Sequence, residues 1–149
     1  MFFWTNSARR SALIDQMEEN AELPQLLREL NATADARQQL ALIVDFNVRL
    51  FERGADVLET LRSAGSVEPD LAATYKDGDT RRRRAQSRLV KGWAAGSALR
   101  AGLGEQDAAD ILWALTSPEV YRLFVHANRW GSERFGDWLR ELLTRLLIG

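Results

Sequence analysis

Apolar residues recur at helical spacing along most of the chain. The run from Leu40 to Phe51 is apolar around most of a helical circumference, and the pattern continues to Leu61 before the turn signal at 64–66. A run this rich in Val, Ile and Phe could also form a buried strand, but its length and 3.6-residue spacing favour a helix surrounded by other helices. We therefore expect one long helix that starts at Asp35 and includes Leu61.

Helix start and stop residues divide the chain before this run. Ser7 can cap a first helix that ends near Asn20. Pro24 then opens a short second helix that ends before Asn31, because proline is tolerated in the first turn of a helix. The N-terminal third is thus predicted to hold two helices ahead of the long one.

The middle of the chain breaks most clearly at 65–69. Asp70 is expected to cap the next helix, and Gly78 is expected to weaken or interrupt it. Ala85, Leu89 and Trp93 then form one helical face that ends near Gly96.

The segment 105–147 contains two amphipathic helices joined by a Gly-Ser turn. Pro118 lacks a backbone donor, so it should kink the first helix or split it at Ser117. The second helix carries an apolar sector too wide for one packing partner, so we expect it to close the domain on one side and contact a second copy on the other. The predicted dimer-interface residues are Ile111, Leu115, Tyr121, Trp138, Leu139, Leu142 and Leu146.

The class predicted by these patterns is all-α, with about six to eight helices in one domain covering 1–149. The chain has 149 residues, of which 46% are hydrophobic, and this is enough for one real core. A net charge of -1 provides no global attraction to nucleic acid. No apolar run is long enough to cross a bilayer, so we expect a cytoplasmic protein without membrane contact.

Candidate chemistry is sparse. The absence of cysteine excludes disulfides, thiolate nucleophiles and Cys-ligated metals, and the single histidine, His126, excludes a two-histidine metal site. His126 is interpreted as a capping or surface residue. No phosphate-binding glycine motif or nucleophile motif is present. We expect no catalytic residue, no metal site and no cofactor.

The run Arg81–Arg84, with Arg88, is the densest positive patch. Successive arginines on a helix point in different directions, so at most Arg81 and Arg84 can share a face with Arg88. Asp77 and Asp79 can neutralise part of this charge. The pattern favours a solvated helix face over a binding site for phosphate or an acidic partner.

A ligand pocket is the remaining candidate site. Asn47 falls on a stripe that otherwise faces inward, and a buried amide needs hydrogen-bond partners, which either a ligand or water in a pocket or a neighbouring helix can supply. Any effector is expected to be small and largely apolar. Its expected binding site lies between the helix at 40–61, the helix at 85–93 and the start of the closing pair, as we call the two helices of 105–147. The candidate ligand-binding residues are Phe46, Asn47, Phe51, Tyr75, Leu89, Trp93 and Trp113, although the aromatic residues among them also suit an ordinary core.

The C-terminal third resembles the last helix pair of TetR-family transcriptional regulators. The residues that carry the resemblance are Ala108-Ala109-Asp110, Leu112-Trp113-Ala114-Leu115, Ser117-Pro118-Glu119, Tyr121, Trp130 and Trp138-Leu139. The resemblance implies that this pair forms a four-helix bundle with its twofold mate. It also implies that the remaining helices enclose an effector pocket.

The chain departs from this family at its start. TetR-family members begin with a helix-turn-helix unit, and there is no room for one before Ser7. The stretch FFWTNSARRSAL is similar to the exit of that unit, so 1–20 is interpreted as a remnant of the link to it. We therefore expect a dimeric regulatory domain that does not bind specific DNA by itself. The alternative is a structural interaction module without a pocket, which pairs with itself or with an intact regulator.

Overall fold

The computed structural model describes residues 6–149, with side chains from Ala12 onward. The expectations for the aromatic start of FFWTNSARRSAL and for capping by Ser7 lie outside the described side chains. Over 6–149 the chain is all-α, as expected, with eight α-helices and one π-helical segment. The elements are α1 (Asn6–Asn20), α2 (Leu23–Asn31), α3 (Ala36–Arg53), α4 (Ala55–Ala64), α5 (Pro69–Ala95), α6 (Glu105–Leu115), α7 (Pro118–Tyr121), η1 (Arg122–Ala127) and α8 (Ser132–Leu147).

The predicted long helix is divided in two at Gly54. Asp35 caps α3 as expected, since its side chain accepts a hydrogen bond from the Arg37 backbone amide. A Cβ on Gly54 would lie 2.7 Å from Cε of Met17 and 2.8 Å from the Leu50 carbonyl oxygen. A residue without a side chain fits this close approach. The backbone of Gly54, with φ -102° and ψ 11°, leaves helical geometry, and α4 begins at Ala55.

The prediction that Gly78 interrupts the fifth helix is wrong. Helix α5 runs without a break through its 27 residues, and it begins at Pro69, with Glu68 rather than Asp70 in the N-cap position. A Cβ on Gly78 would lie 3.0 Å from Cδ1 of Ile14 on α1. Gly78 therefore allows two helices to approach closely, and the packing of α1 offsets the weak helix propensity of glycine.

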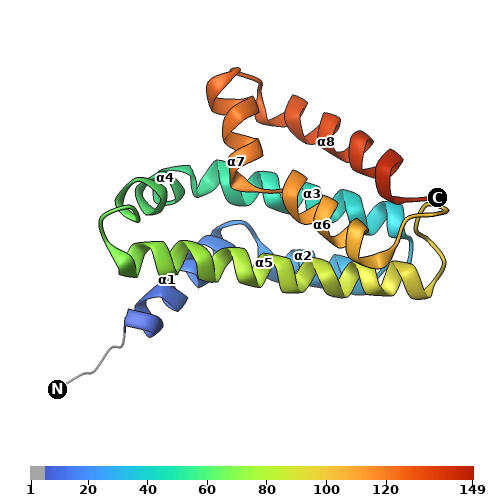
Figure 1. Cartoon of the computed structure of the whole chain (residues 1–149), viewed down its shortest axis with the longest axis horizontal. Helices are drawn as coiled ribbons and strands as arrows, with labels where there is room; N and C mark the ends of the chain where they lie inside the picture. Colours follow the sequence, from blue (N-terminus) through green and yellow to red (C-terminus); the bar gives the residue numbers. More distant parts are fainter. Residues whose placement is uncertain (1–5) are drawn as a thin grey trace.

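Helices α3 and α5 form the centre of the molecule (Figure 1). Helices α6 and α8 pack over one side of them, and α1 and α2 pack on the other side. The closing core, as we call the larger apolar cluster, joins Leu40 and Val44 of α3 to Leu112 of α6 and to Leu139 and Leu143 of α8. A smaller cluster joins α2 to the opposite face of α3.

Pro118 splits the first helix of the closing pair, as predicted. Helix α6 ends at Leu115, and Ser117 caps α7 by accepting a hydrogen bond from the Val120 amide. The turn after α7 is a π-helix, followed by the Gly131 turn and α8. Aromatic rings from these segments stack in one cluster, in which the Phe124 ring lies 4.8 Å from Trp130 and 4.6 Å from Trp138.

The C-terminus lies beside the loop between α5 and α6 (Figure 1). The Arg100 amide donates to the Leu147 carbonyl, and the Gly149 amide donates to the Ala98 carbonyl. These bonds tie the end of α8 to the loop and so fix one end of the closing core.

Candidate ligand-binding site

The main pocket, as we call it, has a volume of about 530 Å³ and lies between α1, α2, α3, α4 and α5. Five predicted ligand-binding residues lie on its wall, although they come from different helices. These are Phe46, Asn47, Phe51, Tyr75 and Leu89. The volume falls within the range of about 300–1,000 Å³ that is typical of small-molecule sites.

Trp93 and Trp113 lie outside this wall, and their indole groups are already bonded. Trp93 is buried in the closing core and donates from Nε1 to Gln39. Trp113 donates from Nε1 to Asp79, and the Arg83 guanidinium lies 4.5 Å above its ring. Both residues therefore tie helices together outside the pocket.

Sequence reasoning missed the part of the wall that comes from α1 and α2. Ile14, Met17, Leu26 and Leu30 line the main pocket, whereas the closing pair contributes only Pro118. These residues are spaced like any amphipathic helix face, and nothing in their pattern distinguishes a pocket wall from a packed core. Only the positions of α1 and α2 against α3 and α5 make them pocket residues.

Two buried side-chain amides stand on this wall. Asn47 is 4% exposed and Gln86 is 2% exposed. Among the described residues, Oδ1 of Asn47 and Oε1 of Gln86 have no hydrogen-bond partner. Asn47 was expected to bond a neighbouring helix or a pocket ligand, but its Nδ2 donates to the Ile43 carbonyl of its own helix at 2.8 Å.

The arginine run is a solvated face only in part, because Arg84 and Arg88 are exposed but Arg82 is buried. Arg82 has a side chain only 9% exposed, and it donates to the Trp113 carbonyl, to Oγ1 of Thr116 and to Asp79. Burial lowers the pKa of Arg82, while the hydrogen bond to Asp79 opposes that shift.

The two neighbours of Arg82 are also paired. Arg81 pairs with Asp15 and Glu18 of α1, and Arg83 pairs with Asp110 of α6. Three of the four arginines therefore connect α5 to other elements, because adjacent positions on a central helix face different neighbours.

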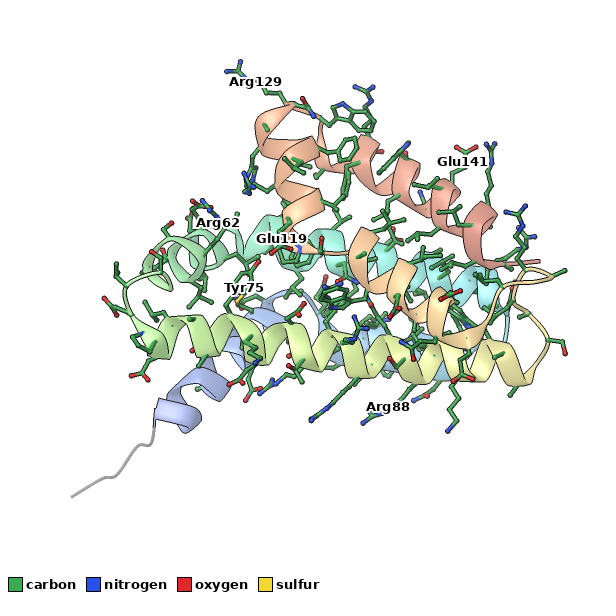
Figure 2. The ribbon with its side chains drawn as sticks, viewed as in Figure 1. Arg62, Tyr75, Arg88, Glu119, Arg129 and Glu141 are labelled. Atoms are coloured by element: carbon green, nitrogen blue, oxygen red, sulfur yellow. The ribbon has the colours of Figure 1, made fainter. Side chains whose placement is uncertain are left out.

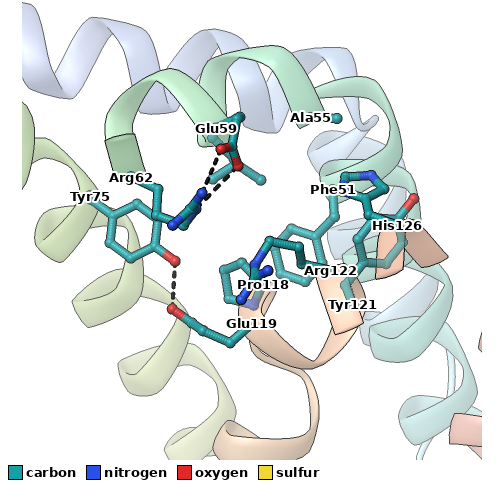
Figure 3. Close-up of a pocket in the computed structure, with 11 residues that line it drawn as sticks. Phe51, Ala55, Glu59, Arg62, Tyr75, Pro118, Glu119, Tyr121, Arg122 and His126 are labelled. Carbon is teal, nitrogen blue, oxygen red and sulfur yellow. Dashed lines mark hydrogen bonds and ion pairs between the residues drawn. The ribbon is translucent and has the colours of Figure 1, made fainter. Parts of the chain in front are cut away.

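A small pocket of about 30 Å³ adjoins the main one (Figure 3). Tyr75, Phe51, Leu58 and Pro118 line both pockets. The Tyr75 hydroxyl donates to Oε1 of Glu119 at 2.6 Å and so links α5 to α7. Figure 3 shows this bond, and Figure 2 shows where the two residues lie in the molecule. Burial and this hydrogen bond raise the pKa of Tyr75 well above its usual value.

The predicted interface residues separate into two groups. Tyr121 and Leu139 are 4% and 1% exposed within a single chain, so they belong to the closing core and we remove them from the predicted interface. Tyr121 is held between the rings of Phe51 and Phe135, each with its centroid 5.6 Å away. The residues that stay partly exposed are Ile111, Leu115, Trp138, Leu142 and Leu146.

The remaining candidates for chemistry within 6–149 are metal-binding side chains and His126. No group of three potential metal-binding side chains is found among the described residues. His126 is exposed at the end of η1, with its ring edge-on to Tyr121.

No protein-family model, curated protein or solved structure matches this chain. None of the helices in the described part of the chain is both long and apolar enough to cross a membrane.

Proposed function

We propose that this chain is a ligand-sensing regulatory domain of the TetR type, which binds a small, largely apolar molecule in the main pocket and forms a twofold dimer. The observation that carries the proposal is the main pocket. It offers about 530 Å³ between α1, α2, α3, α4 and α5, whereas the side of α3 and α5 covered by α6 and α8 is tightly packed. A domain that served only as an interaction module would gain stability by filling this space.

The chemistry of the wall supports an apolar ligand. Apolar side chains from α1, α2 and α3, such as Ile14, Leu26, Leu30 and Ile43, form much of the lining. Affinity for such a ligand comes mainly from buried apolar area. The few polar groups on the wall would then fix its orientation.

Ligand binding is tested by thermal unfolding with straight-chain and aromatic alcohols. A ligand at about 100 times its Kd stabilises the folded state by about 2.7 kcal/mol, which raises Tm by about 5–10 °C. Leu30→Trp adds bulk to the pocket wall and should abolish the shift. Leu123→Trp places the same side chain on η1, where Leu123 is 49% exposed, and should preserve it. A panel that leaves Tm unchanged would favour the interaction module instead.

The dimer is proposed to form through the outer face of α8. Trp138, Leu142 and Leu146 stand four residues apart, and all three remain partly exposed in the single chain. The spacing places them on one face, and the resemblance to the TetR family predicts that this face meets its twofold mate.

Leu142→Glu should convert the dimer to a monomer, because it would place a charge on the apolar seam of both copies. Sedimentation at micromolar concentration measures the mass. Val67→Glu is the matched control, since Val67 is 77% exposed in the turn before α5 and its replacement should leave the dimer intact. A wild-type chain that sediments as a monomer would contradict the proposed dimer but not the ligand site.

A further inference from the structure

Gln86 presents its amide in one fixed orientation. Its Nε2 donates to Oγ1 of Thr116 at 2.7 Å, and the Thr116 hydroxyl donates its own proton to the Leu112 carbonyl at 2.6 Å. Because that proton is committed, Thr116 can only accept from Gln86. The NH₂ end of Gln86 must therefore face Thr116, and its carbonyl oxygen is left as a buried acceptor without a partner among the described residues, in a residue that lines the pocket.

Asn47 is oriented in the same way from the opposite helix. Its Nδ2 donates to the Ile43 carbonyl, and a carbonyl oxygen can only accept. Exchanging the oxygen and nitrogen of Asn47 would place two acceptors against each other. Its Oδ1 is thus a second buried acceptor that lacks a partner among the described residues, and Asn47 also lines the pocket.

A third side-chain amide on the wall, that of Gln39, has no unpaired group. Gln39 accepts from Nε1 of Trp93 and donates to the Thr33 carbonyl, so both ends of its amide are used. The two buried side-chain atoms of wall residues that lack a partner among the described residues, Oδ1 of Asn47 and Oε1 of Gln86, are both acceptors. A ligand that satisfies them must bring hydrogen-bond donors.

Four of the five charged wall residues are paired with one another, since Arg82 bonds Asp79 and Arg81 bonds Glu18. The fifth, Arg88, is exposed to solvent. A ligand carboxylate or ammonium group held away from Arg88 would have to break one of the two pairs to be compensated. The wall therefore favours an uncharged ligand.

We propose that the ligand is an uncharged molecule with an apolar body and at least one O–H or N–H group, which donates to Oδ1 of Asn47 or Oε1 of Gln86. This inference rests on the proposed function, since it names the class of ligand for the same pocket. Leaving a buried acceptor unpaired costs free energy, so a ligand that supplies the donor binds better than an analogue that cannot.

Two isomers provide the test. 1-Decanol and 1-methoxynonane have the same atoms and nearly the same length, but only the alcohol has a donor. Isothermal titration of the wild-type chain should show 1-decanol binding about tenfold more tightly than the ether. Decanoate, which is charged and only accepts hydrogen bonds at neutral pH, should bind more weakly than the alcohol.

Variants locate the donor contact. Asn47→Leu and Gln86→Leu each remove one acceptor, and at least one of them should reduce the preference for the alcohol toward equality. Leu30→Ala is the control, because it removes apolar contact area from the wall and should lower the affinity for both isomers by the same factor. If one amide variant fails to fold, the other variant and the wild-type comparison remain decisive.

Each outcome has a separate meaning. Equal affinity of the wild-type chain for the two isomers, or tighter binding of decanoate, would overturn the donor inference and leave the proposed ligand site standing. A preference that survives both amide substitutions would also overturn it. If neither isomer nor decanoate binds, the proposed function itself is contradicted, and the inference falls with it.

Discussion

The two sides of the α3–α5 centre are built differently from similar residues. On the side covered by α6 and α8, Leu112, Leu139 and Leu143 are at most 1% exposed and belong to one continuous core. On the side covered by α1 and α2, the buried cluster is small, and it borders a pocket of about 530 Å³. The comparison shows that apolar helix faces in one domain can pack into a filled core on one side and enclose a pocket on the other.

The difference arises from the residues that α5 presents to each side. Helix α5 presents Val90 and Trp93 to the closing core but Ala85 and Gln86 to the pocket. Small residues leave volume, and a buried amide limits how closely apolar neighbours can collapse around it. One side is therefore suited to stability and the other to binding.

The same substitution on each side should have unequal effects. Leu143→Ala should lower the free energy of unfolding by about 3–4 kcal/mol, because it opens a cavity in a filled core. Leu30→Ala on the pocket wall should cost about 1–2 kcal/mol, because Leu30 is only partly buried in the folded chain. Urea denaturation of both variants measures the difference.

Equal losses in these two variants would break the comparison. They would mean that the pocket side is packed as tightly in solution as the closing core. A ligand that binds the main pocket should raise the stability of the Leu143→Ala variant as much as that of the wild-type chain, because the two sites are separate.

Arg82 joins the two sides, so its replacement should have the next largest effect. Arg82→Met removes the hydrogen bonds to the Trp113 carbonyl, Thr116 and Asp79, and should lower the free energy of unfolding by about 2 kcal/mol. Arg84→Met is the matched control on the exposed face of the same run and should change it by less than about 0.5 kcal/mol. Chemical denaturation of the two variants measures both free energies of unfolding. Similar losses in the two variants would mean that Arg82 is as solvated as Arg84.

Tyr75 should produce the smallest effect. Tyr75→Phe removes the hydrogen bond to Glu119 and should cost about 0.5–1 kcal/mol near neutral pH. The pKa of Tyr75 is raised in the folded chain, so its stabilising contribution is complete below the unfolded value of about 10 and is lost as the pH rises above it. The variant should therefore lose less stability than the wild type above about pH 10, as followed by circular dichroism.

The residual alkaline loss in that variant has a known source. Burial also raises the pKa of Tyr121, which remains in the closing core. The contrary outcome is that the stability of the wild type and that of the variant fall in parallel above about pH 10. That result would show that the Tyr75 hydroxyl is solvated in the folded chain, and it would contradict the link between α5 and α7.

Much of the secondary structure followed from local signals. The cap at Asp35, the stop at Asn20 and the split at Pro118 each depend on one residue and its immediate neighbours, so pattern reasoning placed them correctly. Among the errors in helix boundaries, the predicted cap at Asp70 was two residues late, since Glu68 is in the N-cap position. The errors at Gly54 and Gly78 have a different origin. Both glycines face α1 at short distance, and a contact with a distant segment cannot be read from local spacing.

The pocket was predictable only in part. Helical periodicity placed Phe46, Phe51 and Leu89 on inward faces, and the structure finds them on the wall of the main pocket. It could not separate them from Trp93, which also faces inward but packs in the closing core. The contribution of Gln86 was missed because a glutamine within a charged helix carries no sign of burial in its sequence context.

By itself, the sequence determined the all-α class, most helix ends and the faces that turn inward, because these depend on interactions between residues a few positions apart. The tertiary structure alone decided which inward faces meet and which leave a pocket. It also decided that Arg82 is buried and that two amides keep an acceptor without a partner among the described residues. These properties depend on where distant helices come to lie, because burial and hydrogen bonding are set by neighbours in space.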